Sequence, residues 1–391
     1  MQPLAVYVHI PFCTVKCGYC DFNAYSGMDN LKEAYGAALV AEVHANASLL
    51  SGRTIASIGF GGGTPGEVPA AHIGAVVAAI GQHARLDPAA EVTLEANPGT
   101  LDRPQLEALR AAGVTRLSIG AQSFHADELR FLDRIHSPQA TAAAVGLARK
   151  AGFESIGLDL IYGLPGQALD AWIGSLGTAI GLAPDHISIY ALTVEDGTPL
   201  ARRVRKGEVT PPDPDAVADL YEAATGSLAA AGYLQYELSN WARPGHHSRH
   251  NMVYWTDGEY LAIGAGAHGY LGGERYQNIA HPRAYIAAVE ERAPAPHPGR
   301  ESAYRPGAVT AMADWFSLRL RLLEGFHEPE FEARFGLPLR KVGGVVLDDC
   351  ASAGVLELAP GVRLTRAGRL LHGEVSARFL AHLQNTLAAT G

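Results

Sequence analysis

Three of the four cysteines in the sequence lie close together, at Cys13, Cys17 and Cys20, with C-x3-C-x2-C spacing. They follow an apolar, strand-like segment that includes Tyr7. Because exposed thiolates oxidise readily, three in one loop indicate that a soft metal or a metal cluster binds them. Zinc and an iron–sulfur cluster both suit such a set, and either would leave one coordination place without a cysteine.

The missing fourth ligand distinguishes these two interpretations. A structural zinc site is closed by a fourth Cys or His, but only His9 is nearby, and Pro11 restricts how the chain could bring it back to the thiols. A four-iron cluster held by three cysteines would instead keep one iron open for an outside ligand. We therefore predict a [4Fe–4S] cluster at Cys13, Cys17 and Cys20, with a zinc site or an unliganded buried trio as alternatives.

A glycine-rich run, GGGTPG at 61–66, follows the strand predicted at 55–60. Glycines there let the backbone approach a ligand closely and present its N–H groups. The run also fits the G-x-G-x-x-G pattern of dinucleotide sites, but no helix opens within it, which argues against that function. An ordinary turn from strand to loop is the alternative without a ligand.

Polar residues also follow other predicted strands, at Glu95, Gln122 and Asp159. In parallel barrels and partial barrels, catalytic residues gather at the carboxyl ends of the strands. One such residue more often caps a helix or bonds the backbone than binds a ligand. The prediction of a site therefore depends on all three sharing one rim with the cysteines and the glycine run.

A second candidate site lies at 246–255, where His246, His247 and His250 stand near Tyr254 and Trp255. Imidazole is a common metal ligand, and flat aromatic side chains suit a planar ligand. A packed loop that closes the barrel explains these residues equally well. The residues alone leave both interpretations open.

Together these motifs resemble the radical S-adenosylmethionine (SAM) family, in the branch of the oxygen-independent coproporphyrinogen III dehydrogenases (HemN) and the haem chaperones of the HemW type. The cysteine spacing, the GGGTP run and the HNxxYW sequence at 250–255 carry the resemblance. It implies a [4Fe–4S] cluster whose open iron binds the amine and carboxylate of SAM. The dehydrogenases have a further cysteine two residues after the third ligand; Phe22 stands there, which favours the HemW type.

The resemblance also implies which residues contact SAM and haem. The expected SAM residues are Tyr7, Tyr19, Gly62, Gly63, Thr64, Glu95, Gln122, Arg134 and Asp159. Among them, Arg134 can form a two-pronged pair with a carboxylate. The haem candidates are His250 as axial ligand, with Tyr254 and Trp255 as flat apolar contacts.

The implied function is that of a radical SAM haem chaperone, which passes haem to acceptor haem proteins. Members of the family accept an electron from a cellular donor and can cleave SAM to methionine and a 5′-deoxyadenosyl radical, so an enzymatic activity is compatible with the motifs. No catalytic residue is assigned. The alternative function is oxidative decarboxylation of coproporphyrinogen III in porphyrin biosynthesis.

The elements that must position these residues alternate as strand and helix between positions 55 and 191, which predicts an α/β fold with a partial (β/α)6-type TIM barrel. This radical SAM domain, with the HNxxYW extension, is expected at 1–291, and the proline-rich segment 292–307 predicts a linker. A small winged-helix-like α+β domain of the HemN C-terminal type is expected at 308–391. The basic run at 200–207 predicts a solvated loop, and Cys350 is expected in a core.

Composition excludes several other classes of protein. The formal charge of −9 leaves no basic footprint for nucleic acid, so no nucleic-acid partner is expected. We expect no signal peptide, because the N-terminus lacks a basic region and a cleavage site, and no membrane span, because Glu42 and His44 interrupt the longest alanine-rich run. These features predict a cytoplasmic protein, in a reducing compartment that suits an oxygen-sensitive cluster.

Overall fold

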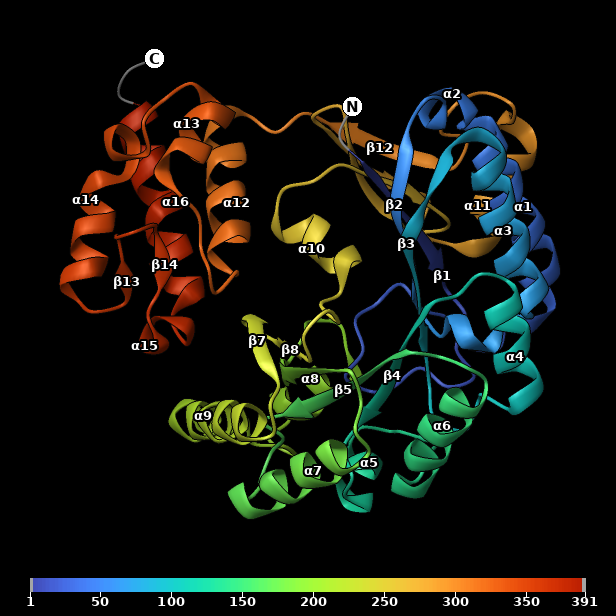
Figure 1. Ribbon diagram of the computed structural model, residues 1–391, viewed down its shortest axis with the longest axis horizontal. Helices are drawn as coiled ribbons and strands as arrows, with labels where there is room; N and C mark the ends of the chain where they lie inside the picture. The colour runs from blue at the N-terminus through green and yellow to red at the C-terminus, as the bar shows by residue number, and fades with distance from the viewer. Residues whose placement is uncertain (1–2, 389–391) are drawn as a thin grey trace.

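A curved sheet organises the computed structural model, which describes residues 3–388. The strand order within it is β12-β11-β10-β9-β1-β2-β3-β4-β5-β6-β8-β7. Strands β1 to β6 lie side by side in chain order and are parallel, as the alternating pattern predicts. Figure 1 shows the sheet curving, with its helices on the outside. The predicted α/β class and the six-stranded partial barrel are confirmed.

The parallel strands and their helices alternate along the first half of the chain. The strands are β1 (Leu4–Ile10), β2 (Thr54–Gly62), β3 (Arg85–Ala96), β4 (Arg116–Gln122), β5 (Ser155–Tyr162) and β6 (His186–Ala191). The helices are α1 (Lys32–Ala45), α2 (Ala47–Leu50), α3 (Ala70–His83), α4 (Arg103–Ala111), α5 (Ala126–Phe131), α6 (Pro138–Lys150) and α7 (Leu169–Gly181). Strand β1 is buried along nearly its whole length, as expected for a parallel strand covered on both faces.

Several helices begin with the same local signal, a Ser, Thr or Asp N-cap followed by proline in the first turn. The cap side chains of Asp102, Ser137, Thr198 and Asp213 each accept a hydrogen bond from a backbone N–H group of the helix that follows. Thr198 starts α8 (Pro199–Arg205), which contains the basic run. The predicted loop at 200–207 is therefore wrong, because this cap and proline start a helix whose arginines lie near its carboxyl end.

Residues after β6 extend the sheet at both edges. On one side, α9 (Pro214–Ala230) leads to β7 (Leu234–Glu237) and β8 (Asn240–Ala242), and β8 pairs antiparallel with β6. On the other, α10 (Arg249–Trp255) precedes β9 (Tyr260–Ile263), which pairs parallel with β1, and then β10 (His268–Leu271), β11 (Glu274–Asn278), α11 (Pro282–Arg292) and β12 (Arg300–Tyr304). Strand β12 lies within 292–307, so part of the segment expected as a linker continues the sheet.

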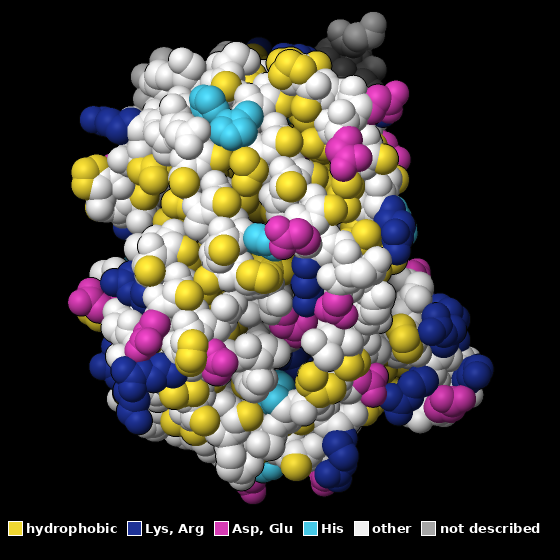
Figure 2. Space-filling model, turned by 90° about the vertical axis from the view of Figure 1, so that its right-hand side faces the viewer, with side chains coloured by type: hydrophobic (Ala, Val, Ile, Leu, Met, Phe, Trp, Pro, Cys, Tyr) yellow, Lys and Arg dark blue, Asp and Glu magenta, His cyan; other side chains and the backbone are white. Residues whose placement is uncertain are grey.

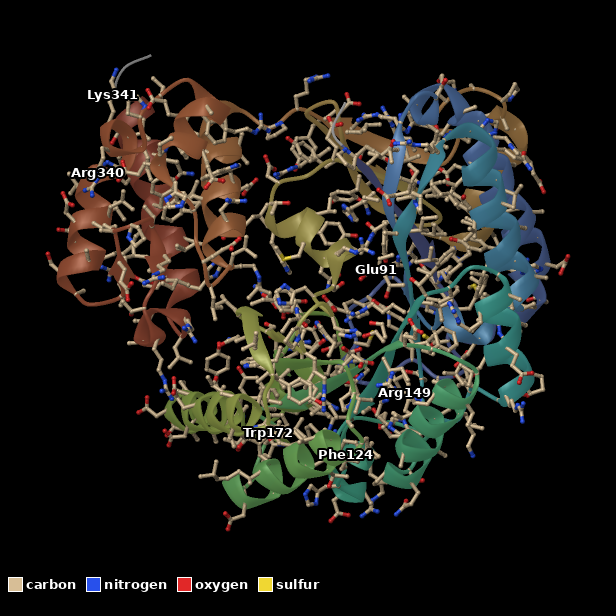
Figure 3. The ribbon with its side chains drawn as sticks, viewed as in Figure 1. Glu91, Phe124, Arg149, Trp172, Arg340 and Lys341 are labelled. Atoms are coloured by element: carbon tan, nitrogen blue, oxygen red, sulfur yellow. The ribbon has the colours of Figure 1, made fainter. Side chains whose placement is uncertain are left out.

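The C-terminal part of the chain has a hydrophobic cluster of its own. It comprises α12 (Ala308–Leu320), α13 (Glu328–Phe335), α14 (Leu339–Ser352), the hairpin of β13 (Leu356–Glu357) and β14 (Arg363–Leu364), α15 (Arg366–Arg369) and α16 (His372–Ala388). Cys350 is buried in this cluster, as predicted. In Figure 1 these helices form a separate body to the left, with α10 between it and the barrel. Figure 3 shows Arg340 and Lys341 on its outer side.

The surface of the barrel helices carries mixed charge. On the face shown in Figure 2, Lys and Arg side chains are interspersed with Asp and Glu side chains.

Within residues 3–388, no helix combines the length and the apolarity needed to cross a bilayer.

The stacked pair of Phe316 and Phe379 gives a test of the second core. Both rings are fully buried, with centroids 3.9 Å apart. We expect Phe379→Ala to lower the free energy of unfolding by about 3–5 kcal/mol, because the lost ring leaves a cavity. Denaturant unfolding monitored by circular dichroism measures this. Leu371→Ala, at an exposed position of the same region, should change stability by less than about 0.5 kcal/mol; equal effects would contradict the packing described.

Candidate functional site

The three cysteines lie in the loop between β1 and α1, at the carboxyl end of β1. Two backbone hydrogen bonds close this loop: Cys13 N–H donates to Tyr25 O at 3.0 Å, and Tyr25 N–H donates to Pro11 O at 2.7 Å. All three thiols are partly exposed and line one cavity of about 410 Å³, called here the outer cavity. Their sulfur atoms therefore face a common space at the carboxyl edge of the parallel strands.

The glycine run fastens this loop to the end of β2. Gly63 N–H donates to Ile10 O and Thr64 N–H donates to Phe12 O, both at 2.7 Å. A Cβ atom on Gly63 would lie 2.6 Å from Phe12 O and 2.9 Å from Ile10 O, which are rigid backbone atoms. Only glycine permits this approach, so the run has a structural task in addition to any contact with a ligand.

Two carboxylates hold the two ends of the cysteine loop. Glu67 accepts hydrogen bonds from the backbone N–H and the hydroxyl of Thr14, at 2.8 and 3.0 Å. Asp133 accepts from Gly18 N–H at 3.1 Å. The loop thus takes its shape from side chains far away in sequence.

Polar groups also reach the cysteine sulfurs directly. Thr64 Oγ1 lies 3.4 Å from Cys13 Sγ, and because Asn97 Nδ2 donates to the same oxygen at 2.9 Å, the Thr64 hydroxyl can donate to sulfur. Arg134 donates from Nη1 to Cys17 Sγ at 3.6 Å and from Nη2 to the side-chain oxygen of Asn97. Hydrogen bonds to thiolate sulfurs stabilise their negative charge and raise the reduction potential of a bound cluster.

Two carboxylates also line the outer cavity. Glu95 is open to the cavity but enclosed by protein, and this desolvation, together with the charge of Asp159, raises its pKa to about 7. Burial also raises the pKa of Asp159, which accepts from the Ser118 hydroxyl at 2.9 Å. Near neutral pH, Glu95 can therefore hold or release a proton.

Most of the residues expected at SAM are brought together, and Tyr7 is set apart. Tyr19, Gly62, Gly63, Thr64, Glu95, Gln122, Arg134 and Asp159 all line the outer cavity. Tyr7 instead lines a smaller cavity of about 120 Å³ inside the barrel, called here the inner cavity. The Tyr7 hydroxyl donates to His9 Nδ1 at 3.0 Å, and His9 Nε2 donates to Asn23 O at 2.9 Å. Through His9, Tyr7 therefore supports the loop that carries the cysteines.

Other lining residues were not singled out from the sequence. Asn97, Ser118 and Tyr190 line the outer cavity, and Asp133 and Glu67 shape the cysteine loop. Asn97 follows a predicted strand and Ser118 lies within one. This position in the sequence is the one feature that could have indicated that they line the site. Their partners lie on other strands, which no local pattern identifies.

The HNxxYW segment forms α10 and lies on the inner side of the sheet. His250 is buried, with Nδ1 bonded to the Ser57 hydroxyl at 2.9 Å and Nε2 bonded to the Tyr254 hydroxyl at 2.8 Å. Burial lowers its pKa to about 4, so the imidazole is neutral at pH 7. The Glu91 carboxylate accepts from His250 N–H at 3.0 Å; Figure 3 shows Glu91 beside α10. The assignment of His250 as an axial ligand stays a prediction, since both ring nitrogens are engaged here.

Trp255 and Tyr254 point to different places. The Trp255 ring stacks under Arg321 of the C-terminal region, with 4.3 Å between the guanidinium carbon and the ring centroid. Tyr254 lines the inner cavity and also a third cavity between β9–β12 and α12. The three haem candidates therefore do not converge on one surface.

The donor set at the outer cavity suits an iron–sulfur cluster. Within residues 3–388, no three His, Cys, Asp or Glu side chains converge closely enough to hold a single metal ion. A four-iron cluster held by three cysteines takes each thiolate on a different iron and leaves the fourth iron open, so its ligands stand farther apart than those of one ion. Burial raises the pKa of the Cys13 thiol to about 11, so metal binding must displace its proton.

Comparisons with known proteins cover nearly the whole chain. The family model described as the radical SAM superfamily matches residues 7–176, and that of the HemN C-terminal domain matches 310–371. The chain is 41% identical over 385 residues to the heme chaperone HemW of Mycobacterium tuberculosis (strain ATCC 25618 / H37Rv), covering 97% of this chain and 95% of the relative. It is 36% identical over 390 residues to the heme chaperone HemW of Escherichia coli (strain K12), covering 97% and 99%.

A solved structure shares the fold. The coproporphyrinogen III oxidase HemN of Escherichia coli, described as a radical SAM enzyme, matches with a TM-score of 0.84 at 24% sequence identity. The match covers 98% of this chain and 91% of that one. The arrangement of barrel and C-terminal region is therefore common to both proteins.

The contact at Gly63 predicts how a small substitution affects metal loading. Gly63→Ala places a methyl group against the carbonyls of Ile10 and Phe12, so the cysteine loop must move. After anaerobic reconstitution, we expect the iron and acid-labile sulfide content to fall to less than about half of the wild-type content. The reason is that the backbone on both sides of Gly63 is hydrogen-bonded and cannot move aside for a methyl group without strain. Gly146→Ala, on an open face of α6, is the matched control and should load fully; full loading of both variants would contradict the proposed clamp.

Proposed function

The chain belongs to the family of HemW haem chaperones within the radical SAM superfamily, and we propose from this membership that it binds haem and transfers it to acceptor haem proteins. The membership is shown by full-length similarity, with relatives covered over at least 95% of their length in the two cases above. As a radical SAM protein it takes a [4Fe–4S] cluster and SAM as cofactors. We further propose that it does so in the cytoplasm, with a cellular electron donor.

The outer cavity is the observation that supports the cofactor assignment. We propose that Cys13, Cys17 and Cys20 hold the cluster, because these thiols face one cavity together with nearly all the residues expected at SAM. When bound, the cluster supplies one electron for the reductive cleavage of SAM. The protein residues have supporting tasks: Thr64 and Arg134 hydrogen-bond the sulfurs, and the glycine run keeps the loop closed.

Charge is distributed in the outer cavity so that a zwitterionic ligand would have one orientation. Arg134 hydrogen-bonds Cys17 Sγ, while Glu95 and Asp159 line the cavity from β3 and β5. A carboxylate bound near the cysteines is attracted by the guanidinium, and cationic or hydroxyl groups are directed toward the carboxylates. We propose that SAM binds in this orientation, with Tyr19, Gln122 and the remaining members of the set as further contacts.

The haem-binding element is proposed to include the HNxxYW segment, because the segment lies on the described cavities. Tyr254 opens onto two cavities, and His250 fixes its hydroxyl. Trp255 ties the segment to the C-terminal region through Arg321. We propose that Tyr254 contacts haem and that Trp255 couples its site to α12; His250 is the ligand candidate that the sequence motif names, and both its ring nitrogens are bonded within the protein.

A haem-transfer assay tests the proposed function. The protein is reconstituted anaerobically, titrated with hemin and mixed with an apo-haem protein such as apomyoglobin; we expect stable haem binding followed by transfer, seen in the absorption spectra. The same preparation is incubated with coproporphyrinogen III, SAM and reductant. Turnover of coproporphyrinogen without retained haem would contradict the chaperone function and support the dehydrogenase, and zinc in place of iron and sulfide would contradict the cofactor assignment.

The raised pKa of Glu95 predicts that SAM binding depends on pH. Its pKa of about 7 leaves it neutral at pH 6 and charged at pH 8, so binding of the cationic cofactor should tighten as pH rises through about 7. Glu95→Gln should remove this inflection and weaken binding at pH 8 about tenfold, the effect of losing about 1.4 kcal/mol from a charged hydrogen bond. Asp159→Asn should move the inflection lower, because the like charge that raises the pKa is gone. Calorimetry at several pH values measures both; an unchanged inflection near pH 7 in Glu95→Gln would exclude this carboxylate as its cause.

A further inference from the structure

A cleft separate from the outer cavity lies between the extended edge of the sheet and the C-terminal region. Its volume is about 390 Å³, within the usual range of roughly 300–1,000 Å³ for ligand pockets. Its walls come from the end of α10, from β9 to β12 and from α12, where Leu318 contributes. It shares no lining residue with the outer cavity. We call it the tyrosine cleft, because its lining includes Tyr254, Tyr260, Tyr270, Tyr276 and Tyr304.

Two of these tyrosine rings contact each other before any ligand arrives. Tyr254 and Tyr260 meet edge to face, with centroids 4.8 Å apart. Tyr276 is buried, accepts at its hydroxyl from Ala262 N–H at 2.7 Å and packs against His297, so it anchors the sheet beside the cleft. A Cβ atom on Gly269 would lie 2.2 Å from the Tyr276 ring, so glycine makes room for it. Rigid aromatic walls suit a flat, apolar ligand, because little conformational entropy is lost on binding.

One histidine side chain of the tyrosine cleft is open. His268 begins β10, is exposed, and makes no side-chain hydrogen bond to the described residues. His250, in contrast, is buried with both nitrogens bonded and does not line the tyrosine cleft. A neutral imidazole with a free nitrogen is the usual protein ligand of haem iron.

The charged side chains at the rim of the tyrosine cleft are paired with one another. A ligand would therefore bind there by ring contact and metal ligation rather than by ion pairing. Arg275 lines the tyrosine cleft and pairs with Asp314 at 2.5 Å. Arg334 donates to the Tyr270 hydroxyl at 2.7 Å and pairs with Asp257. These two cations and two anions balance, so the rim offers a carboxylated ligand no net attraction.

From these observations we propose that the tyrosine cleft is the porphyrin site and that His268 ligates the haem iron, an inference that rests on the proposed haem-chaperone function. The HNxxYW segment then acts by positioning: His250 holds the hydroxyl of Tyr254, and Tyr254 forms one wall of the tyrosine cleft. His250 is in this arrangement a positioning residue and not the ligand.

Hemin titration of matched histidine variants tests the proposal on the full-length, cluster-loaded protein. We expect His268→Ala and His268→Gln to lose the histidine-ligated absorption and EPR signature and to bind hemin at least about tenfold more weakly, a loss of about 1.4 kcal/mol. Added imidazole should restore the signature in His268→Ala. His250→Ala should keep the signature while weakening affinity, because Tyr254 loses its partner. His44→Ala, which changes an exposed histidine on α1 outside the three cavities, should match the wild type.

The results of these titrations distinguish a failure of this proposal from a failure of the haem-chaperone function on which it rests. Iron, sulfide and SAM binding equal to the wild type show that each variant is folded. If the wild type binds no hemin, the proposed function itself fails. If the wild type binds hemin and both His268 variants keep its spectrum and affinity, the function stands and the tyrosine cleft is excluded. Loss of the signature in His250→Ala alone would make His250 the ligand and overturn the proposal.

Discussion

The backbone contact between the glycine run and the cysteine loop is the constraint on which the rest of the site depends. Strands β1 and β2 pair in register up to Ile10 and Gly62, and the bonds from Gly63 and Thr64 continue this pairing beyond the strand ends. The loop that carries three thiols has little regular structure, so its geometry comes from this extension of the sheet. A side chain at Gly63 would separate the two segments, and the thiols would no longer share a cavity wall with the carboxyl ends of the other strands.

Arg134 shows how the same rim is held together by side chains. Its guanidinium bonds Cys17 Sγ, the Asn97 side chain and Gly120 O, so it joins the cysteine loop, the end of β3 and the end of β4. Asn97 continues the connection to Thr64. A planar group with several donors can join three segments at once, which a lysine cannot do. The positive charge beside the thiols is therefore structural as well as available to a bound carboxylate.

The sequence predicted the chemistry of the site better than its geometry. Cysteine spacing, the glycine run and polar residues after strands are local patterns, and they placed Glu95, Gln122 and Asp159 on one rim because parallel strands share their carboxyl edge. The position of Tyr7 in a different cavity, the bridge through Asn97 and the burial of His250 depend on contacts between distant strands. Helix α8 differs from the predicted loop for a different reason: the Thr198 cap and Pro199 start a helix despite the run of arginines that follows.

The arrangement of the three cavities bears on why this fold can serve as a carrier. The outer and inner cavities share Glu95, Ser118, Asp159 and Tyr190, whereas the inner cavity and the tyrosine cleft share only Tyr254. Oxidative decarboxylation needs the porphyrinogen within reach of a radical formed beside the cysteines, that is, in the outer cavity. A porphyrin in the tyrosine cleft would occupy a cavity that shares no lining residue with the outer cavity, so it would be held and released without contact with that radical. The same fold thus permits two functions, and the location of the porphyrin decides between them.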